Sequence, residues 1–194
     1  MSKVVVSSIV SLDGYTEGPG GNVMAMPMDH AFDEHNAERM RSAGSILFGG
    51  TTYRGMAGFW PTVVGDPELT PGSSYIARRY ADGIAVTVVS DTVTETDTGA
   101  WREQTTIVRR ADTHEHVARL REQDGGDVLV FGSRTLWGDL LAHGLVDELH
   151  LMMAPAFVAG DHRAFTGVPA AGLRLLDVRR WDGSDNVLLS YATM

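Results

Sequence analysis

The sequence predicts an α/β protein built on a mixed, mostly parallel sheet of about eight strands. Short β-branched runs alternate with helical patterns through most of the chain, which favours parallel strands joined by helices. Residues 127–144, DVLVFGSRTLWGDLLAHG, have the pattern of a strand, a glycine turn and a helix. Near the C-terminus, two strand patterns flank Asp182-Gly183, which predicts an antiparallel hairpin.

Apolar and β-branched runs bounded by turn residues define the strands. In chain order we expect strands at 4–10, 45–48, 84–89, 105–108, 128–131, 148–154, 173–181 and 186–191. The first strand ends at Asp13-Gly14. An irregular segment, 14–28, follows, and its length is typical of a lid over a site or of a disordered loop.

Caps and apolar spacing predict the helices. Asp29 is the expected N-cap of the first helix, and Ser73 or Ser74 that of the third. Asp112 and Glu115 form a plausible capping box for the fourth. The five helices are expected at 30–43, 51–58, 73–80, 112–123 and 133–143.

The glycine turn at Gly132 is the first candidate for a binding site. Gly132 permits a tight turn, Ser133 is a good N-cap for the next helix, and Gly144 ends that helix. Such a turn leaves free N–H groups at a helix N-terminus, where a pyrophosphate can bind. On these residues alone, a plain strand-to-helix turn without a ligand is equally well supported.

Composition bounds the class of protein. A chain of 194 residues is long enough for one core, so we expect a single domain over 1–194. A formal charge of −9 argues against a nucleic-acid or anionic-membrane surface. The absence of cysteine, together with the lack of an HExxH motif, makes a metal site improbable. No signal peptide or spanning segment is visible, so we expect a cytoplasmic protein.

Five motifs, taken in their order and spacing, resemble a known family. They are SLDGY at 11–15, LFGGTTY at 47–53, FW at 59–60, VVSDT at 88–92 and VLVFGSRTLWGDLLAHGLVDELHL at 128–151. With the closing hairpin, they resemble the dihydrofolate-reductase-like fold over nearly the whole chain. The nearest resemblance is to the reductase (C-terminal) domain of riboflavin-biosynthesis deaminase–reductases and their stand-alone relatives, which implies a three-layer α/β structure.

The resemblance implies NADPH as the cofactor, with NADH as an alternative. The implied cofactor-binding residues are Gly49, Gly50, Thr51, Thr52, Ser90, Gly132, Ser133, Arg134, Thr135 and Leu136. Where the family usually places an arginine for the 2′-phosphate of NADPH, this chain has Gly50. The family's frequent Ser-Arg pair is Ser90-Asp91 here, and a carboxylate repels a phosphate. The candidates to replace these lost attractions are Arg54, Arg78 and Arg134.

Two carboxylates are candidate catalytic residues. The family's spacing places Asp33 over the nicotinamide, although an acid in a first helical turn is also favoured by the helix dipole alone. Asp13, before the irregular segment, is the second candidate. Its simpler interpretation is an Asp-Gly turn, which we favour.

Apolar side chains provide candidate walls for a substrate pocket. Tyr15, Met26 and Trp60, with Met24, have the character of a wall for a flat heterocycle. Packing in the core or in the irregular segment is the alternative, and we expect Phe59 and Trp60 to be core residues first.

These observations favour a nicotinamide-dependent reductase acting on a small heterocycle. A ribosylaminopyrimidine of riboflavin synthesis fits the resemblance better than dihydrofolate. The alternative is a non-catalytic nucleotide-binding or dimeric module on the same fold, which Gly50 and Asp91 support. Because relatives often dimerise through the terminal strands, we expect a homodimer, and a monomeric mass by light scattering would exclude it.

Overall fold

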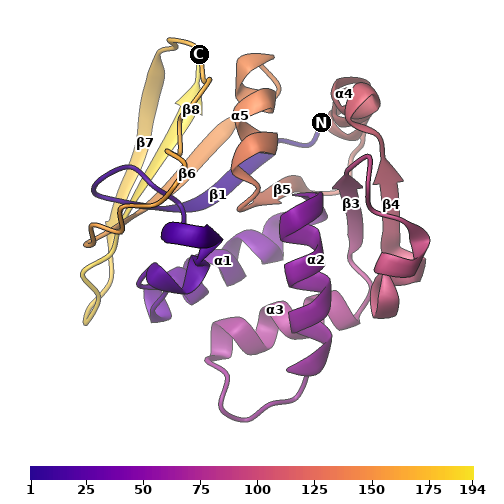
Figure 1. Ribbon diagram of the computed structural model, residues 1–194, viewed down its shortest axis with the longest axis horizontal. Coiled ribbons are helices and arrows are strands. Elements are labelled where there is room, and N and C mark those ends of the chain that lie inside the picture. Colours follow the sequence, from indigo (N-terminus) through magenta and orange to yellow (C-terminus); the bar gives the residue numbers. More distant parts are fainter.

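One sheet of eight strands runs through the molecule, with helices on both faces, as the computed structural model of residues 1–194 shows (Figure 1). The strands lie in the order β4-β3-β2-β5-β1-β6-β8-β7. Strands β1 to β6 are parallel, β8 is antiparallel to β6, and β7 pairs with β8. The mixed sheet and the C-terminal hairpin predicted from the sequence are therefore confirmed. The strands are β1 (Val4–Ser11), β2 (Ala43–Gly49), β3 (Ala85–Val89), β4 (Thr105–Val108), β5 (Asp127–Phe131), β6 (Glu148–Ala154), β7 (Leu173–Arg180) and β8 (Val187–Thr193).

The helices divide between the two faces of the sheet, which gives three layers (Figure 1). On one face, Met40, Tyr53 and Tyr80 of three successive helices share an apolar cluster with the central strands. On the other face, Val117 and Trp137 belong to a second cluster. Each fully buried side chain of this size contributes about 1.5–3 kcal/mol relative to exposure. The helices are α1 (His30–Ser42), α2 (Gly50–Phe59) and α3 (Pro71–Ala81) on the first face, and α4 (Thr113–Glu122) and α5 (Arg134–Ala142) on the second.

The cap of α1 is confirmed, because the carboxylate of Asp29 accepts hydrogen bonds from the N–H groups of Ala31 and Phe32. The predicted cap of α3 is wrong. That helix begins two residues earlier, at a proline, and Thr70 caps it by accepting from the N–H of Ser73.

The predicted capping box of α4 is also wrong. The chain enters α4 through a short 3₁₀ turn, Arg110–Asp112, and Asp112 makes no side-chain cap bond. Thr113 instead donates its hydroxyl to the carbonyl of Arg110. The 3₁₀ turn also takes up the N–H groups of Asp112 and Thr113, which donate to the carbonyls of Arg109 and Arg110.

The irregular segment 14–28 folds into two short 3₁₀ turns, Pro19–Gly21 and Val23–Ala25. It is tied to the segment after β6, since the N–H of Gly20 donates to Asp161 at 2.7 Å. Tyr15 forms a β-bridge with Arg163 of that segment. These two segments therefore lie together.

Strand β7 is the outer edge of the sheet and is exposed along nearly its whole length. Leu175 and Val178 each keep about half of their surface exposed. The apolar surface agrees with the homodimer expected from the sequence, which stays a prediction. No helix combines the length with the apolar character that crossing a membrane requires.

Candidate functional site

Two glycine turns meet at the carboxyl ends of β2 and β5, which are neighbouring strands. Gly49 ends β2 and caps α2, while Gly132 and Ser133 join β5 to α5. The N–H of Gly49 donates a hydrogen bond to Oγ of Ser133 at 2.9 Å. The two turns, far apart in sequence, are thus bonded to each other.

This meeting point is where the chain reverses direction across the sheet. From β2 the chain passes through α2 and α3 to β3, on one side of β2. From β5 it passes through α5 to β6, on the other side. Helices α2 and α5 therefore leave toward opposite faces of the sheet, a topology for which a ligand crevice is expected between the strand ends. In open α/β sheets, ligands bind at such a switch point.

The turn at Gly132 and Ser133 departs from the cap predicted from the sequence. Both residues are left-handed, with φ of 51° and 57°. Ser133 occupies the N-cap position of α5, but its side chain makes no cap bond and accepts from Gly49 instead. A left-handed serine costs about 1–2 kcal/mol, and the bond to Gly49 offsets part of it. The carbonyl of Ser133 accepts from the N–H groups of Leu136 and Trp137.

The junction of α2 and α5 favours an anion. The first N–H groups of a helix have no partner within it, and each helix carries about half a positive charge at its N-terminus. The first turns of both helices, with Thr51, Thr52, Arg134 and Thr135, face this junction. A pyrophosphate matches both the donors and the sign of the field. Leu136 borders the junction with its Cβ, which would lie 3.8 Å from a Cβ at Gly49, while the rest of its side chain packs in the core with 8% of its surface exposed.

Position 50 favours glycine because its backbone lies close to Ser90, the residue that follows β3. A Cβ at position 50 would lie 2.7 Å from Oγ and 3.1 Å from Cβ of Ser90. Ser90 is buried and accepts from the N–H groups of Thr92 and Val93. An arginine at position 50 therefore cannot be accommodated unless Ser90 moves.

Arg54 lies one turn further along α2 and reaches the loop after β3. Its guanidinium donates to the carbonyl of Thr92 at 2.8 Å and is 3.4 Å from Asp97. Asp91, in the same loop, accepts from the N–H of Arg110. The guanidinium of Arg54 thus reaches the loop after β3, although position 50 itself carries no basic side chain. The carboxylate of Asp91 is already hydrogen-bonded to the N–H of Arg110.

Asp13 follows β1 and holds two loops together. Its carboxylate accepts from the hydroxyl of Ser11 at 2.6 Å and from the N–H groups of Val158 and Ala159. The hydrogen bond from Ser11, helped by those from the backbone, lowers the pKa of Asp13 below its ordinary value. The carboxylate is therefore ionised at neutral pH and has no proton to donate.

Asp33 lies in the first turn of α1 and accepts a hydrogen bond from the hydroxyl of Thr70 at 2.7 Å. Thr70 also caps α3, so Asp33 is oriented by the junction of α1 and α3. No hydrogen bond joins Asp13 to Asp33, since the carboxylate of Asp13 is bonded to Ser11, Val158 and Ala159 and that of Asp33 to Thr70. The catalytic role of either residue stays a prediction.

The three predicted substrate-binding residues are not brought together. Met26 is 3% exposed and packs in a small core cluster with Ile9 and Met152, so its side chain is taken up by packing. Trp60 follows the far end of α2, roughly 15 Å along the helix from Gly50. Tyr15 packs under the guanidinium of Arg163.

Trp60 and its neighbour Phe59 differ in environment. Trp60 donates its ring N–H to the sulfur of Met56 and packs on Tyr80, as expected of a core residue. Phe59 remains 49% exposed, so its predicted core position is wrong.

Comparison with known proteins identifies the family. The model of the RibD C-terminal domain matches residues 2–189. The chain belongs to this family. This family consists of reductases of riboflavin biosynthesis, so the chain is an oxidoreductase. No curated protein matches the sequence.

Solved structures with low sequence identity confirm the fold of this RibD C-terminal domain. A protein from Shewanella sp. PV-4 assigned to riboflavin biosynthesis superposes with a TM-score of 0.72 at 19% identity, over 100% of this chain and 99% of that one. The deaminase/5-amino-6-(5-phosphoribosylamino)uracil reductase of Thermotoga maritima gives 0.67 at 15% identity, over 100% of this chain and 57% of that one. Dihydrofolate reductase of Enterococcus faecalis, complexed with NADP(H), gives 0.61 at 11% identity, over 98% and 96%. The predicted dihydrofolate-reductase-like fold is confirmed.

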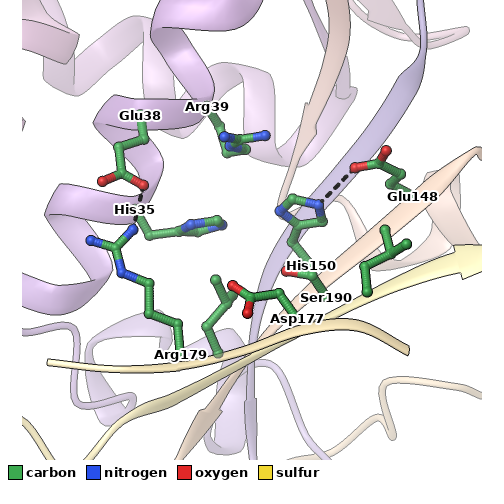
Figure 2. Close-up of a pocket in the computed structure, with 10 residues that line it drawn as sticks. His35, Glu38, Arg39, Glu148, His150, Asp177, Arg179 and Ser190 are labelled. Carbon is green, nitrogen blue, oxygen red and sulfur yellow. Dashed lines mark hydrogen bonds and ion pairs between the residues drawn. The ribbon is translucent and has the colours of Figure 1, made fainter. Parts of the chain in front are cut away.

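The chain also has a polar cavity of about 230 Å³ between α1 and the strands β6, β8 and β7 (Figure 2). His35 of α1 and His150 of β6 face each other across it, with ring centroids 5.4 Å apart. Nε2 of His35 and Nδ1 of His150 are buried without a hydrogen-bond partner. Nε2 of His150 is 3.1 Å from Glu148.

The sequence carried a weak signal for this pair. His35 is one turn after Ala31, on the inward face of α1, and His150 lies within a buried strand. Burial, followed by the charges of His150, Arg39 and Arg179, lowers the pKa of His35 to about 3. Burial also lowers the pKa of His150, against the opposing effect of Glu148.

The buried histidines predict a loss of stability as the solution is acidified. The pKa of His35 is about 3 in the folded state and about 6.5 when unfolded, so below pH 6.5 the unfolded chain binds the proton that the folded chain refuses. His35 alone should therefore cost about 2 kcal/mol of unfolding free energy between pH 6.5 and about pH 5. Urea titrations across this range measure the loss.

Replacing His35 with leucine should flatten this pH dependence. The exposed His162, replaced with glutamine, is the control and should leave the dependence unchanged. A dependence in the leucine variant as steep as in the native chain would contradict the assignment. Carboxylates with lowered pKa values, such as Asp13 and Glu148, lose their contribution at lower pH.

Proposed function

We propose that the chain is an NADPH-dependent reductase whose substrate is a ribosylaminopyrimidine, 5-amino-6-(5-phosphoribosylamino)uracil or a close analogue. Membership of the RibD C-terminal domain family supports the reaction class. The observation that carries the proposal is the junction of α2 and α5, where two helix N-termini face one crevice and are joined by the bond from Gly49 to Ser133.

In this proposal the nicotinamide cofactor supplies the hydride, and the chain binds and orients the cofactor. The backbone N–H groups of 132–135 and of the first turn of α2 would hold the pyrophosphate. Gly132 matters because its φ is 51° and its Cβ position is 3.4 Å from Cγ2 of Thr52. Any side chain there would narrow the space between the two turns.

Arg54 is the residue that we propose for the 2′-phosphate. It extends from α2 to the loop after β3, which is the loop that carries the family's Ser-Arg pair. Its ion pair with Asp97 is long, at 3.4 Å, so its guanidinium can exchange that partner for a phosphate. Arg78 bonds the carbonyl of Ser74 within α3. Arg134 begins α5 and lies at the pyrophosphate end of the site.

Asp33 is the residue that we propose to orient the substrate. Its carboxylate sits at the start of α1, and Thr70 fixes one oxygen by donating a hydrogen bond. A carboxylate suits a pyrimidine that presents adjacent N–H donors. Asp13, ionised and bonded to two loops, fits a positioning role better than that of a proton donor.

A non-catalytic nucleotide-binding module is the second candidate. The observation in its favour is the close approach of Gly50 to Ser90, which leaves no room for the arginine usual in the family. Both candidates bind a nucleotide, so turnover of the pyrimidine substrate in the presence of NADPH separates them.

The proposal predicts that NADPH raises the melting temperature of the chain. At about 100 times its dissociation constant a ligand adds about 2.7 kcal/mol, or roughly 5–10 °C for a chain of this size. Gly132→Asp should abolish the rise, because it places a side chain and a negative charge in the turn. Differential scanning fluorimetry with NADPH and NADH measures both.

Gly144→Asp is the matched control for this variant. Gly144 is also left-handed, with φ of 65°, and follows the other end of α5 with open space at its Cβ position. Its variant should lose some stability and keep the full response to NADPH. If neither cofactor changes the melting temperature of the native chain, the proposal fails.

Arg54→Gln should weaken NADPH and leave NADH unchanged. Loss of a charge-assisted bond costs about 1.5–3 kcal/mol, or roughly 10- to 100-fold in the dissociation constant. Only NADPH carries the phosphate, so the two cofactors are each other's control in calorimetric titrations. Arg78→Gln should affect neither. An equal loss for both cofactors would remove the assignment of Arg54.

A further inference from the structure

Three potential metal ligands converge on the surface between α4 and α5. They are His114, Asp139 and His143, and their donor atoms all lie within 4.8 Å of one another. Nε2 of His114 is 2.7 Å from Oδ2 of Asp139, and Nδ1 of His143 is 3.4 Å from Oδ1. The two imidazole rings lie side by side with centroids 3.9 Å apart. Two imidazoles thus flank a single carboxylate.

The fold rather than the sequence brings these residues together. Asp139 lies in α5 and His143 is the residue that ends this helix, four residues later, a spacing that places two ligands on one ion. His114 is 25 residues before Asp139 and comes from the first turn of α4. The helices are held side by side because Val117 and Trp137 share one apolar cluster.

We propose that His114, Asp139 and His143 bind a divalent transition-metal ion, with Zn²⁺ as the representative ion and water completing the coordination. Imidazole nitrogen and carboxylate oxygen are ligands that Zn²⁺ accepts at about 2.0–2.2 Å. Tetrahedral coordination at these lengths separates the donors by roughly 3.4 Å. The three side chains are each about half exposed, so rotation can bring their donors from 4.8 Å to that separation.

The donor set also decides which ions fit. Ca²⁺ and Mg²⁺ prefer oxygen ligands and six or more of them. Two imidazoles and one carboxylate instead suit Zn²⁺, Ni²⁺ and Cu²⁺. With three protein ligands, the site is open to solvent at the remaining position.

The proposed metal site is separate from the proposed cofactor site at the junction of α2 and α5, so we assign a structural role to the ion. Asp139 and His143 follow Arg134 by five and nine residues, or roughly 7 and 13 Å along α5. An ion there would fasten the second half of α5 to the start of α4. Binding therefore stabilises the helix whose first turn forms part of the cofactor junction, without touching the reacting groups.

Isothermal titration of chelator-treated protein with zinc chloride, in buffer without phosphate, tests the site. We expect one Zn²⁺ per chain, bound in the micromolar range, with a rise in melting temperature. His114→Gln and His143→Gln should each weaken binding by about tenfold or more and remove the rise. A millimolar excess of Mg²⁺ should not compete.

His162→Gln is the control, because His162 is exposed and lies outside the three ligands. It should bind Zn²⁺ as the native chain does. Absence of uptake at submillimolar Zn²⁺, or undiminished uptake in both ligand variants, would overturn the proposal. Since the readouts are binding and melting temperature, the result does not depend on whether the chain reduces a pyrimidine.

Discussion

The hydrogen bond from the N–H of Gly49 to Oγ of Ser133 joins the two glycine turns on which the proposed cofactor site depends. It links the ends of β2 and β5, from which the chain leaves toward opposite faces of the sheet. The left-handed backbone of Gly132 and Ser133 permits the approach. The strand order brings the N-termini of α2 and α5 to the same edge of the sheet, and this bond fixes the two turns relative to each other.

Close packing between α2 and the end of β3 explains why the proposed cofactor site lacks the arginine that the family pattern has at position 50. Gly50 replaces an arginine of the family pattern, and Ser90 fills the space that its Cβ would need. The basic group reappears one helical turn later, at Arg54, in contact with the loop that follows β3. In the proposed site, Arg54 therefore takes the place of the arginine that the family pattern has at position 50. Attraction between an arginine and a phosphate depends on where the guanidinium lies. Because the arginine side chain is long, the position of its Cα does not fix that place.

Local patterns predicted the fold well because periodicity and turn residues act over short distances. The strands, the hairpin around Asp182-Gly183 and the cap at Asp29 were correct for this reason. The caps at Ser73 and Asp112 failed because neighbouring turns offered other partners to the same backbone groups. The assignment of Leu136 to the cofactor site stays a prediction, since its Cβ lies beside Gly49 and the rest of its side chain packs in the core.

The site was less predictable because it depends on contacts between distant segments. The sequence identified the two glycine turns separately but not the bond between them. It could not show that Met26 packs in the core or that Trp60 lies at the far end of α2. His114, Asp139 and His143 show the same limit, since nothing in their sequence spacing links α4 to α5.

Backbone amide NMR of the chain with and without NADPH tests the central claim most directly. If the junction of β2 and β5 is the cofactor site, the largest shifts will fall on residues 49–52 and 132–135, with a separate group around Arg54. The amides of His35 and His150, in the other cavity, should change little. Shifts concentrated around His35 and His150, with none at the two glycine turns, would contradict the account.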